Sequence, residues 1–209
     1  MSDVAVSDAE LERWLREAQV RGLVGPRELP SAINHARELG KVATEGLSVS
    51  PRALDVGSGG GLPGLVLAVD WLTWSWVLLD SYHRAAVFLR EAVDALPLAD
   101  RVTVAEARVE DFARDPAEKG AYGLVMGRSV AALPAMCEYA APLLEVGGRL
   151  VVSQPPGRSG VVPEQALDRL GMRLERVTTE PSAAVFHQVA ACPPEFPRRA
   201  GIAVKRPLR

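Results

Sequence analysis

The sequence predicts an α/β protein in which helices cover both faces of a mostly parallel, doubly wound sheet. From residue 52 onward, short apolar runs alternate with amphipathic stretches, and this alternation is typical of parallel sheets. A glycine-rich turn follows the first apolar run. Near the end of the chain, two extended runs flank Glu180-Pro181-Ser182, and so short a connection predicts an antiparallel hairpin at one edge of the sheet.

Two helices are predicted ahead of the sheet. Ser7-Asp8-Ala9-Glu10 has the pattern of a capping box, and apolar residues at helical spacing follow it. A second helix fits residues 31–39, and Gly40 is expected to end it. We therefore divide the chain into residues 1–50, an N-terminal helical extension, and residues 51–209, the domain that holds the sheet.

Apolar runs bounded by glycine, proline and acidic residues predict the strands, and the stretches between them predict helices. The predicted strands are residues 53–56, 74–79, 102–104, 122–126, 149–152, 172–179 and 183–191. The predicted helices are residues 63–69, 82–95, 130–144 and 164–170. Because helical stretches separate the first five strands, these strands are expected to be parallel.

The composition is that of a globular protein of the cytoplasm. Of the 209 residues, 48% are hydrophobic and 24% are charged, and no apolar run is long enough to span a membrane. The first residues are acidic and contain no apolar signal segment. Cys137 and Cys192 lie far apart without metal-binding spacing, which favours free thiols in a reducing compartment.

Charge is distributed unevenly along the chain. The formal net charge is only −2, but residues 151–209 contain nine basic and five acidic side chains. No acidic residue follows Glu195, so the C-terminal tail is basic. Such a tail is either a flexible charged terminus or a site for the phosphate groups of RNA. Its basic residues are Arg198, Arg199, Lys205, Arg206 and Arg209.

The glycine-rich turn predicts a ligand site because it lies between a strand and a helix. Gly57, Gly59 and Gly61 allow positive φ and a close approach of the backbone to a ligand. Gly59, Gly61 and Gly64 match the GxGxxG pattern of dinucleotide sites. A GxGxG pattern that starts at Gly57 and follows Asp55 in the strand suits S-adenosylmethionine better, because that ligand has an amino-acid end and no pyrophosphate.

Asp80 supports an adenosine-containing cofactor. It lies 23 residues after Gly57, at the end of the second predicted strand, and Ser81 follows it. An acidic residue at this place can accept hydrogen bonds from both ribose hydroxyls. This signal fits NAD and S-adenosylmethionine equally.

Five segments carry a resemblance to a known family. They are Asp55-Val56-Gly57-Ser58-Gly59-Gly60-Gly61-Leu62-Pro63-Gly64, Leu79-Asp80-Ser81, Ala107-Arg108-Val109-Glu110-Asp111-Phe112, Gly127-Arg128-Ser129-Val130-Ala131-Ala132-Leu133 and Phe196-Pro197-Arg198-Arg199-Ala200-Gly201. From about residue 33 to its end, the chain resembles the bacterial ribosomal RNA small subunit methyltransferase G family, also called glucose-inhibited division protein B.

The resemblance implies a Rossmann-like class I methyltransferase fold. It implies an enzyme that uses S-adenosylmethionine to methylate N7 of a guanine in 16S ribosomal RNA. The partner that it implies is this RNA, either alone or in the small ribosomal subunit. The cofactor contacts that it implies are Gly57, Leu62, Val109, Glu110 and Arg128, with an acidic residue in the first turn of a helix as the alternative role of Glu110. The glycine-turn and ribose arguments add Asp55, Ser58, Gly59, Gly61, Asp80 and Ser81.

Two side chains are assigned to catalysis. Arg128 is expected to hold the cofactor carboxylate or the RNA, with a surface ion pair as the alternative role. His35 is expected to stack on or hydrogen-bond the target base, with an ordinary partly buried histidine as the alternative. Guanine N7 carries a lone pair at neutral pH, so its methylation needs no general base. Placing N7 in line with the methyl group is then the main catalytic requirement.

Three positions depart from the family pattern. Asn34 stands where the family often has arginine, Gly123 where it has aspartate, and the segment around Pro156 replaces a lysine-glycine pair. These departures leave open a paralogue that methylates another RNA or a small molecule. The GxGxxG match leaves open an NAD-dependent oxidoreductase, and a cofactor-binding protein without catalysis is a third alternative.

Overall fold

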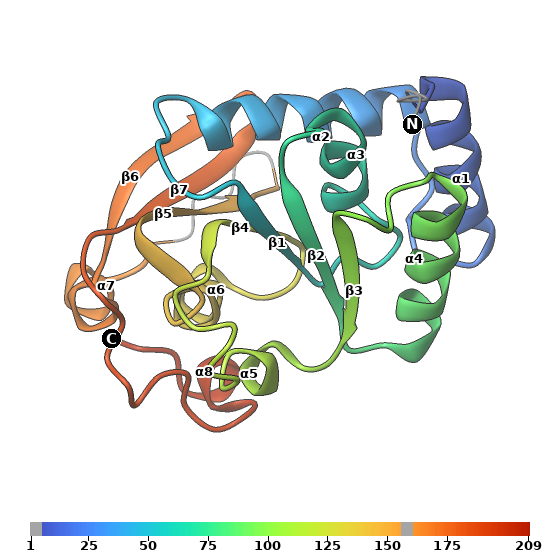
Figure 1. Cartoon of the computed structure of the whole chain (residues 1–209). Coiled ribbons are helices and arrows are strands. Elements are labelled where there is room, and N and C mark those ends of the chain that lie inside the picture. Colours follow the sequence, from blue (N-terminus) through green and yellow to red (C-terminus); the bar gives the residue numbers. More distant parts are fainter. Residues whose placement is uncertain (1–5, 156–160) are drawn as a thin grey trace.

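The computed structural model describes residues 6–155 and 161–209, and a twisted sheet forms its centre (Figure 1). The strands are β1 (Arg52–Val56), β2 (Ser75–Asp80), β3 (Val102–Glu106), β4 (Tyr122–Arg128), β5 (Leu144–Ser153), β6 (Met172–Thr179) and β7 (Ser182–Gln188). Their order is β3-β2-β1-β4-β5-β7-β6. The first five strands are parallel, and β7 is antiparallel to both β5 and β6. The predicted fold class and the edge hairpin are confirmed.

Helices lie on both faces of this sheet (Figure 1). They are α1 (Asp8–Val20), α2 (Leu29–Thr44), α3 (Gly64–Asp70), α4 (His83–Ala95), α5 (Val109–Phe112), α6 (Leu133–Ala140), α7 (Glu164–Leu170) and α8 (Ile202–Lys205). Buried residues of α1 to α4 belong to one apolar cluster, and those of α5 to α8 belong to a second. The short helix α8 was not predicted, and α5 begins where Glu110 had a first-turn position as its alternative role.

The side chains of successive residues in a strand belong alternately to the two clusters. In β2, Leu78 belongs to the first cluster, while Val77 and Leu79 belong to the second. Both faces of the strand are therefore buried, which explains why the central strands are continuous apolar runs in the sequence. Hydrophobic burial on two faces is the main stabilising contribution to the fold.

The first two helices pack onto the sheet through the first apolar cluster. The predicted capping box is present at α1: the Glu10 amide donates to Ser7 Oγ at 3.3 Å, and the Ser7 amide donates to Glu10 Oε2 at 3.0 Å. Arg37 of α2 joins Asp8 of α1 and Asp70 of α3 through ion pairs of 2.6 and 2.8 Å. The helical layer over this face is thus connected by charge as well as by apolar contact.

The prediction that Gly40 ends the second helix is wrong, because α2 continues to Thr44. A Cβ added to Gly40 would lie 2.6 Å from Leu67 Cδ2 and 2.8 Å from Trp71 Cζ2. The missing side chain lets α2 and α3 approach closely. This glycine serves packing rather than helix termination, a distinction that spacing along one helix does not show.

Other predicted boundaries also moved. The helix expected over 130–144 is only Leu133–Ala140, and β5 begins five residues before its predicted start, at Leu144. Pro142 has no amide hydrogen with which to continue the helix. The last strand ends at Gln188 rather than 191, because the amides of the next two residues donate to the carbonyl of Gly171.

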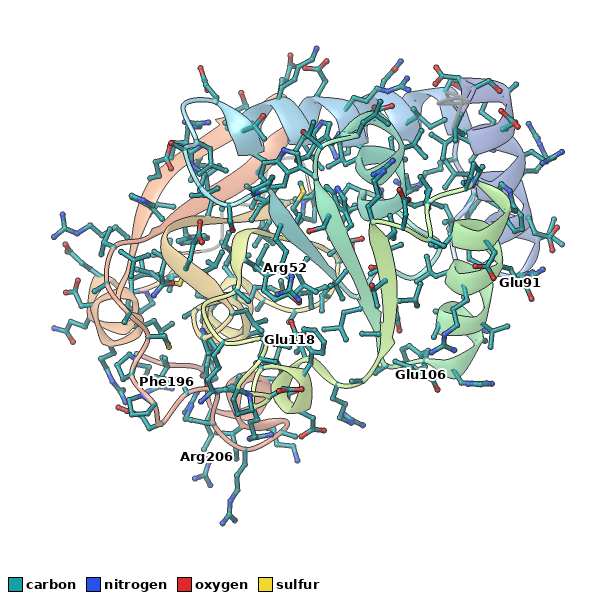
Figure 2. All side chains as sticks on the ribbon, in the orientation of Figure 1. Arg52, Glu91, Glu106, Glu118, Phe196 and Arg206 are labelled. Atoms are coloured by element: carbon teal, nitrogen blue, oxygen red, sulfur yellow. The ribbon has the colours of Figure 1, made fainter. Side chains whose placement is uncertain are left out.

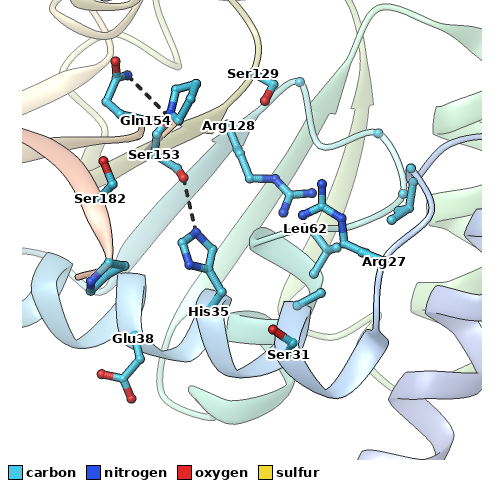
Figure 3. A pocket seen from close by; sticks show the side chains of 18 of the residues that line it. Arg27, Ser31, His35, Glu38, Leu62, Arg128, Ser129, Ser153, Gln154 and Ser182 are labelled. Atoms are coloured by element: carbon cyan, nitrogen blue, oxygen red, sulfur yellow. Dashed lines mark hydrogen bonds between the residues drawn. The ribbon is translucent and has the colours of Figure 1, made fainter. Parts of the chain in front are cut away.

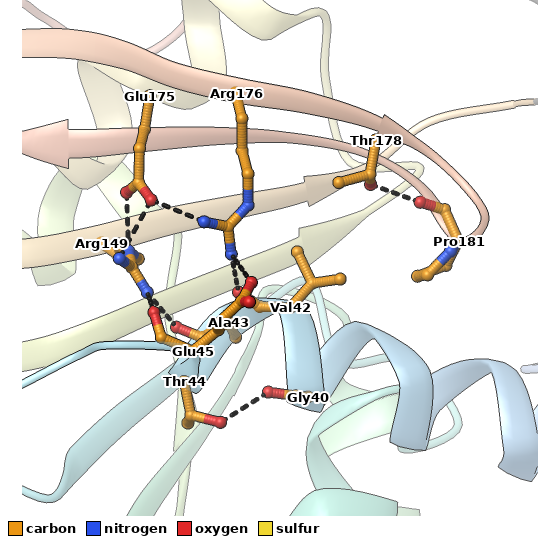
Figure 4. A network of polar contacts seen from close by, with 10 residues as sticks. All are labelled: Gly40, Val42, Ala43, Thr44, Glu45, Arg149, Glu175, Arg176, Thr178 and Pro181. Carbon is orange, nitrogen blue, oxygen red and sulfur yellow. Dashed lines mark hydrogen bonds and ion pairs between the residues drawn. The ribbon is translucent and has the colours of Figure 1, made fainter.

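The carboxyl end of α2 is fastened to the sheet by a polar network (Figure 4). Arg149 of β5 donates to the carbonyl oxygens of Ala43 and Glu45 at 3.1 and 2.7 Å. Its guanidinium also pairs with both carboxylate oxygens of Glu175 in β6, at 2.7 and 3.0 Å. Since Arg149 is buried, this bidentate pair orients α2 firmly over the sheet.

The C-terminal tail is packed against the domain. Phe196, Ala203 and Leu208 are buried in the second apolar cluster. The alternative of a flexible charged terminus is therefore wrong for this tail as a whole. Figure 2 shows the Arg206 side chain directed outward from the same segment. No helix in the described parts of the chain is long and apolar enough to cross a membrane.

Candidate functional site

Two cavities open at the carboxyl ends of the parallel strands, where α/β sheets bind ligands. The larger has a volume of about 1140 Å³, and the smaller has a volume of about 450 Å³. Gly57 and Ser129 line both cavities. The glycine-rich turn and the loop after β4 therefore form the boundary across which one elongated ligand can reach into both spaces.

The glycine-rich turn has the backbone conformation that its sequence predicts. The φ angles of Gly57, Gly59 and Gly61 are 67°, 53° and 93°. A Cβ on Gly57 would lie 2.6 Å from Cγ2 of Val130, so this position also has no room for a side chain. Leu62, at the end of the turn, lines the larger cavity, and its amide has no hydrogen-bond partner among the described residues.

Asp55 lies beneath the turn and lines neither cavity. Its Oδ2 accepts a hydrogen bond from the amide of Gly64 at 3.0 Å, and Ser58 Oγ donates to its carbonyl oxygen at 2.9 Å. The side chain is 1% exposed, and Oδ1 has no partner in the described part of the chain. Burial raises the pKa of this carboxyl to about 7. Asp55 therefore holds the turn against the start of α3.

The raised pKa of Asp55 predicts a pH-dependent stability. Because its pKa is about 7 in the folded chain and about 4 when unfolded, its contribution is full below pH 4 and is lost as pH rises to 7. We expect Asp55→Asn, which keeps an acceptor for Gly64, to remove this slope. In urea unfolding without cofactor, the stability of the variant relative to wild type should rise by about 2–4 kcal/mol between pH 4.5 and 7.5. A constant difference across this range would contradict the prediction.

Asp80 and Ser81 line the smaller cavity at the end of β2. The carboxylate of Asp80 is 7% exposed and accepts from the amide of Gly59 at 2.8 Å and from the amide of Tyr82 at 2.9 Å. Each carboxylate oxygen keeps a further lone pair. Asp80 thus supports the glycine turn and still presents acceptors to the cavity.

Val109 and Glu110 form the first turn of α5 and line the smaller cavity from the opposite side. The Glu110 carboxylate accepts from the amide of Gly201 at 2.7 Å, so this side chain connects α5 to the tail. Burial raises the pKa of Tyr139 to about 12, and the charge of Glu110 and its hydrogen bond to Tyr139 contribute to this shift. Within the described chain, the amides of Val109 and Glu110 have no hydrogen-bond partner, and they are the groups available to a ligand.

Arg128 ends β4 and extends into the larger cavity (Figure 3). Its guanidinium makes no hydrogen bond or ion pair with any residue that the structure describes. Burial and the positive charge of Arg27 lower its pKa. An arginine that is half-buried and has no counter-ion is poised for an anion. The alternative role of Arg128 as a surface ion pair is not realised.

His35 of α2 faces the same cavity (Figure 3). Its Nε2 lies 3.3 Å from Oγ of Ser153 at the end of β5. Burial and the charges of Arg128 and Arg27 lower its pKa and so favour the neutral imidazole. A neutral imidazole can offer either a donor or an acceptor to a ligand in this cavity.

The candidate residues separate into three groups. Those that line the larger cavity are His35, Gly57, Ser58, Gly59, Leu62 and Arg128. Those that line the smaller cavity are Gly57, Asp80, Ser81, Val109 and Glu110. Asp55 and Gly61 line neither and shape the turn from behind.

Sequence reasoning missed Arg27 and Ser153, which also line the larger cavity. Arg27 lies in the loop between α1 and α2, and no motif marks it. Ser153 is the last residue of β5, and its position after a predicted strand is a weak signal. Ser129 was noted only as part of a motif. It lines both cavities, and its φ of 59° is unusual for a residue with a side chain.

Two of the three departures from the family pattern lie away from these cavities, whereas Ser153, Gln154 and Pro155, which begin the third, line the larger one. Asn34 is exposed and lines neither cavity. Gly123 is near the amino end of β4, at the end of the strands opposite to the cavities. A Cβ added there would lie 2.3 Å from the carbonyl oxygen of Ser50. Gly123 is thus required by packing. Pro156 lies outside the described residues.

The basic tail contributes to the smaller cavity through Gly201 and Val204. Arg198 is directed inward: its amide and Nε donate to Oε1 of Glu138 at 3.1 and 2.8 Å, and its Nη2 donates to Oε2 at 2.5 Å. The charge of Arg198 is therefore used within the fold. The other basic tail residues, Arg199, Lys205, Arg206 and Arg209, are exposed.

Comparison with known proteins identifies the family. The family model described as rRNA small subunit methyltransferase G matches residues 11–155. The ribosomal RNA small subunit methyltransferase G of Rubrobacter xylanophilus is 38% identical over 178 residues, which cover 79% of this chain and 68% of that protein. The protein of the same name from Symbiobacterium thermophilum is 32% identical over 213 residues, which cover 95% of this chain and 86% of that protein.

A solved structure shares the fold. The SAH-bound methyltransferase of Podospora anserina superposes with a TM-score of 0.59 and 16% identity, covering 87% of this chain and 88% of that chain. The order of strands and the position of the cavities agree with a Rossmann-like methyltransferase. Sequence and fold together lead to one assignment: the chain belongs to the ribosomal RNA small subunit methyltransferase G family.

Proposed function

We propose that this chain transfers a methyl group from S-adenosylmethionine to N7 of a guanine in 16S ribosomal RNA, in the cytoplasm. The observation that carries the proposal is the pair of cavities that meet at Gly57, with an arginine lacking a counter-ion in one and a carboxylate in the other. Membership of the family supports both the reaction and the RNA substrate.

The smaller cavity fits the adenosine part of the cofactor. Asp80 presents carboxylate oxygens for the ribose hydroxyls, and the unpaired amides of Val109 and Glu110 can donate to nitrogen atoms of the adenine ring. Ser81 lies beside Asp80 on the same wall. The SAH-bound methyltransferase of similar fold supports a ligand of this class.

The larger cavity fits the amino-acid end of the cofactor next to the glycine turn. Arg128 can pair with the carboxylate, and the unpaired amide of Leu62 can donate to the same group. Ser58 and Gly59 complete the wall. When bound, the cofactor supplies an electrophilic methyl group on its sulfonium.

The residues of this chain would then act by positioning. Since N7 of guanine already carries a lone pair, the chain has to hold the base in line with the methyl group and exclude water. We assign His35 to the edge or face of the target base, because its neutral imidazole faces the larger cavity opposite Ser153. No proton needs to be removed from N7.

In this proposal the basic tail binds the RNA, and the two segments of the chain have separate roles. The exposed tail residues Arg199, Lys205, Arg206 and Arg209 offer positive charge beside the smaller cavity. Residues 1–50 are proposed as an extension that completes the wall of the larger cavity, and residues 51–209 as the cofactor-binding domain.

Calorimetry and a methylation assay test the proposal. We expect binding of S-adenosylmethionine and S-adenosylhomocysteine but no comparable binding of NAD. With labelled S-adenosylmethionine, undermethylated small ribosomal subunits or 16S RNA should acquire label at N7 of one guanine. Binding of the cofactor without label in RNA would favour another methyl acceptor, and tight binding of NAD alone would exclude a methyltransferase.

Asp80→Ala is expected to weaken the binding of S-adenosylmethionine by about 1–3 kcal/mol, because hydrogen-bonding groups are left unpaired at the ribose and at Gly59. Calorimetry measures the change. Asp94→Ala, at an exposed position near the end of α4, is the matched control and should leave the affinity unchanged. Equal affinities for Asp80→Ala and wild type would remove Asp80 from the cofactor site.

A further inference from the structure

Arg27 and Arg128 form an unusual pair of cations in the larger cavity. Figure 3 shows their guanidinium groups extending toward each other, one from the loop between α1 and α2 and the other from the end of β4. Together with burial, which is the larger cause, the positive charge of Arg27 lowers the pKa of both Arg128 and His35, so the three groups share one electrostatic environment. Like charges this close repel each other unless an anion lies between them or beside them.

Within the described chain, the carboxyl group that attracts Arg128 is that of Asp55, which is buried beneath the glycine turn and lines neither cavity. Neither Arg27 nor Arg128 makes an ion pair or a side-chain hydrogen bond with a described residue. The acidic residues lining this cavity are Glu28, Glu38 and Glu180. All three are exposed, and Glu38 is paired with Lys41 at 2.7 Å. The cavity thus offers two guanidinium groups to anions that come from outside the chain.

The two arginines differ in depth. Arg128 is half-buried and belongs to the strand that borders the glycine turn, whereas Arg27 is exposed and belongs to a loop at the mouth of the cavity. The volume of about 1140 Å³ exceeds that of most pockets for one small ligand, roughly 300–1,000 Å³. There is room for the amino-acid end of a cofactor at Arg128 and for a second group nearer to solvent.

We propose that Arg27 binds a phosphodiester group of the RNA substrate and thereby positions the target nucleotide beside Arg128 and His35. This inference rests on the proposed function, because it assigns the deeper arginine to the cofactor carboxylate. An arginine fork matches the geometry of phosphate oxygens and adds affinity without reading the base. Ser31, exposed in the first turn of α2, lines the same part of the cavity and offers a hydroxyl donor.

The test separates RNA binding from cofactor binding. Arg27→Ala, Arg27→Lys and the wild type are compared with Arg16→Ala, an exposed arginine of α1 that lines neither cavity. Calorimetry measures the affinity for S-adenosylmethionine. Affinity for unmethylated 16S RNA is measured over a series of salt concentrations, and methyl transfer gives kcat and KM.

For Arg27→Ala we expect unchanged affinity for S-adenosylmethionine and an RNA KM raised about tenfold, with a smaller effect on kcat. The slope of log affinity for RNA against log salt should become shallower by about 0.7–0.9, the loss of one phosphate contact. Arg27→Lys should restore most of the slope because it keeps the charge. Arg16→Ala should behave as wild type.

Two results would overturn the inference. An unchanged salt slope in Arg27→Ala would show that Arg27 contacts no phosphate. A loss of cofactor affinity as large as the loss of RNA affinity would assign Arg27 to the cofactor instead. The salt slope does not depend on methyl transfer, so a wild-type chain that binds RNA without methylating it would refute the proposed function alone.

Discussion

Replacing Arg128 by alanine is expected to weaken the binding of S-adenosylmethionine by about 10- to 100-fold, the effect of losing a charge-assisted pair worth about 1.5–3 kcal/mol. The half-buried guanidinium has no partner among the described residues, so the cofactor carboxylate is the group that would satisfy it. The rate of methyl transfer at a subsaturating concentration of the cofactor should fall by at least the same factor as the affinity. Calorimetry and initial rates measure the two effects.

Stability distinguishes a binding role of Arg128 from a structural one. Because the cation is partly desolvated and makes no ion pair with a described residue, its removal should leave the free energy of unfolding of the cofactor-free chain unchanged or raise it. Arg128→Lys keeps the charge but loses the fork, and it should retain part of the affinity. If Arg128→Ala unfolds more easily and binds the cofactor as wild type does, the guanidinium serves the fold and our assignment is wrong.

Replacing Glu138 by alanine is expected to lower the free energy of unfolding by about 3–5 kcal/mol, the usual cost of breaking a buried ion pair. Glu138 lies in α6, is 1% exposed and accepts three hydrogen bonds from Arg198. The pair holds the tail against the second apolar cluster. Urea unfolding measures the change, with exposed Glu164→Ala at the start of α7 as the control.

We expect the same substitution of Glu138 to lower the affinity of the proposed cofactor site as well. The tail supplies Gly201 and Val204 to the wall of the smaller cavity, and the amide of Gly201 holds the carboxylate of Glu110. Loosening the tail should therefore weaken S-adenosylmethionine binding, although Glu138 lines neither cavity. In a double-mutant cycle, Arg198→Ala should add little destabilisation to Glu138→Ala. Fully additive effects of the two substitutions would show that the pair does not act as one unit.

Much of the fold could be predicted from the sequence because local patterns determine it. The alternation of apolar runs and helical stretches is imposed by a sheet buried on both faces, and it predicted that the first five strands are parallel. The short connection at Glu180-Pro181-Ser182 predicted the final hairpin. The glycine-rich turn was recognised because positive φ and close packing at Gly57 leave few residue types possible. Asp80 was found for a similar reason, since its place at a strand end is fixed by spacing along the chain.

Element boundaries were predicted less well, since they depend on contacts between distant segments. Gly40 looked like a helix end, but it lies inside α2, where the partner is Leu67 of another helix. Similarly, β5 begins at Leu144 within a stretch whose composition suits a helix. Neither position carries a local signal strong enough to compete with its tertiary surroundings.

The sequence by itself determined the class of fold, the glycine turn, the acidic residue at the end of the second strand and the family, because each depends on residue type and spacing along the chain. Only the tertiary structure decided which charges remain available to ligands. Arg198 looked free and is paired with buried Glu138, whereas Arg27, which no motif marks, extends into the larger cavity beside Arg128. The reason is physical: availability of a charge depends on the counter-ions that the fold brings near it, and these come from distant parts of the chain.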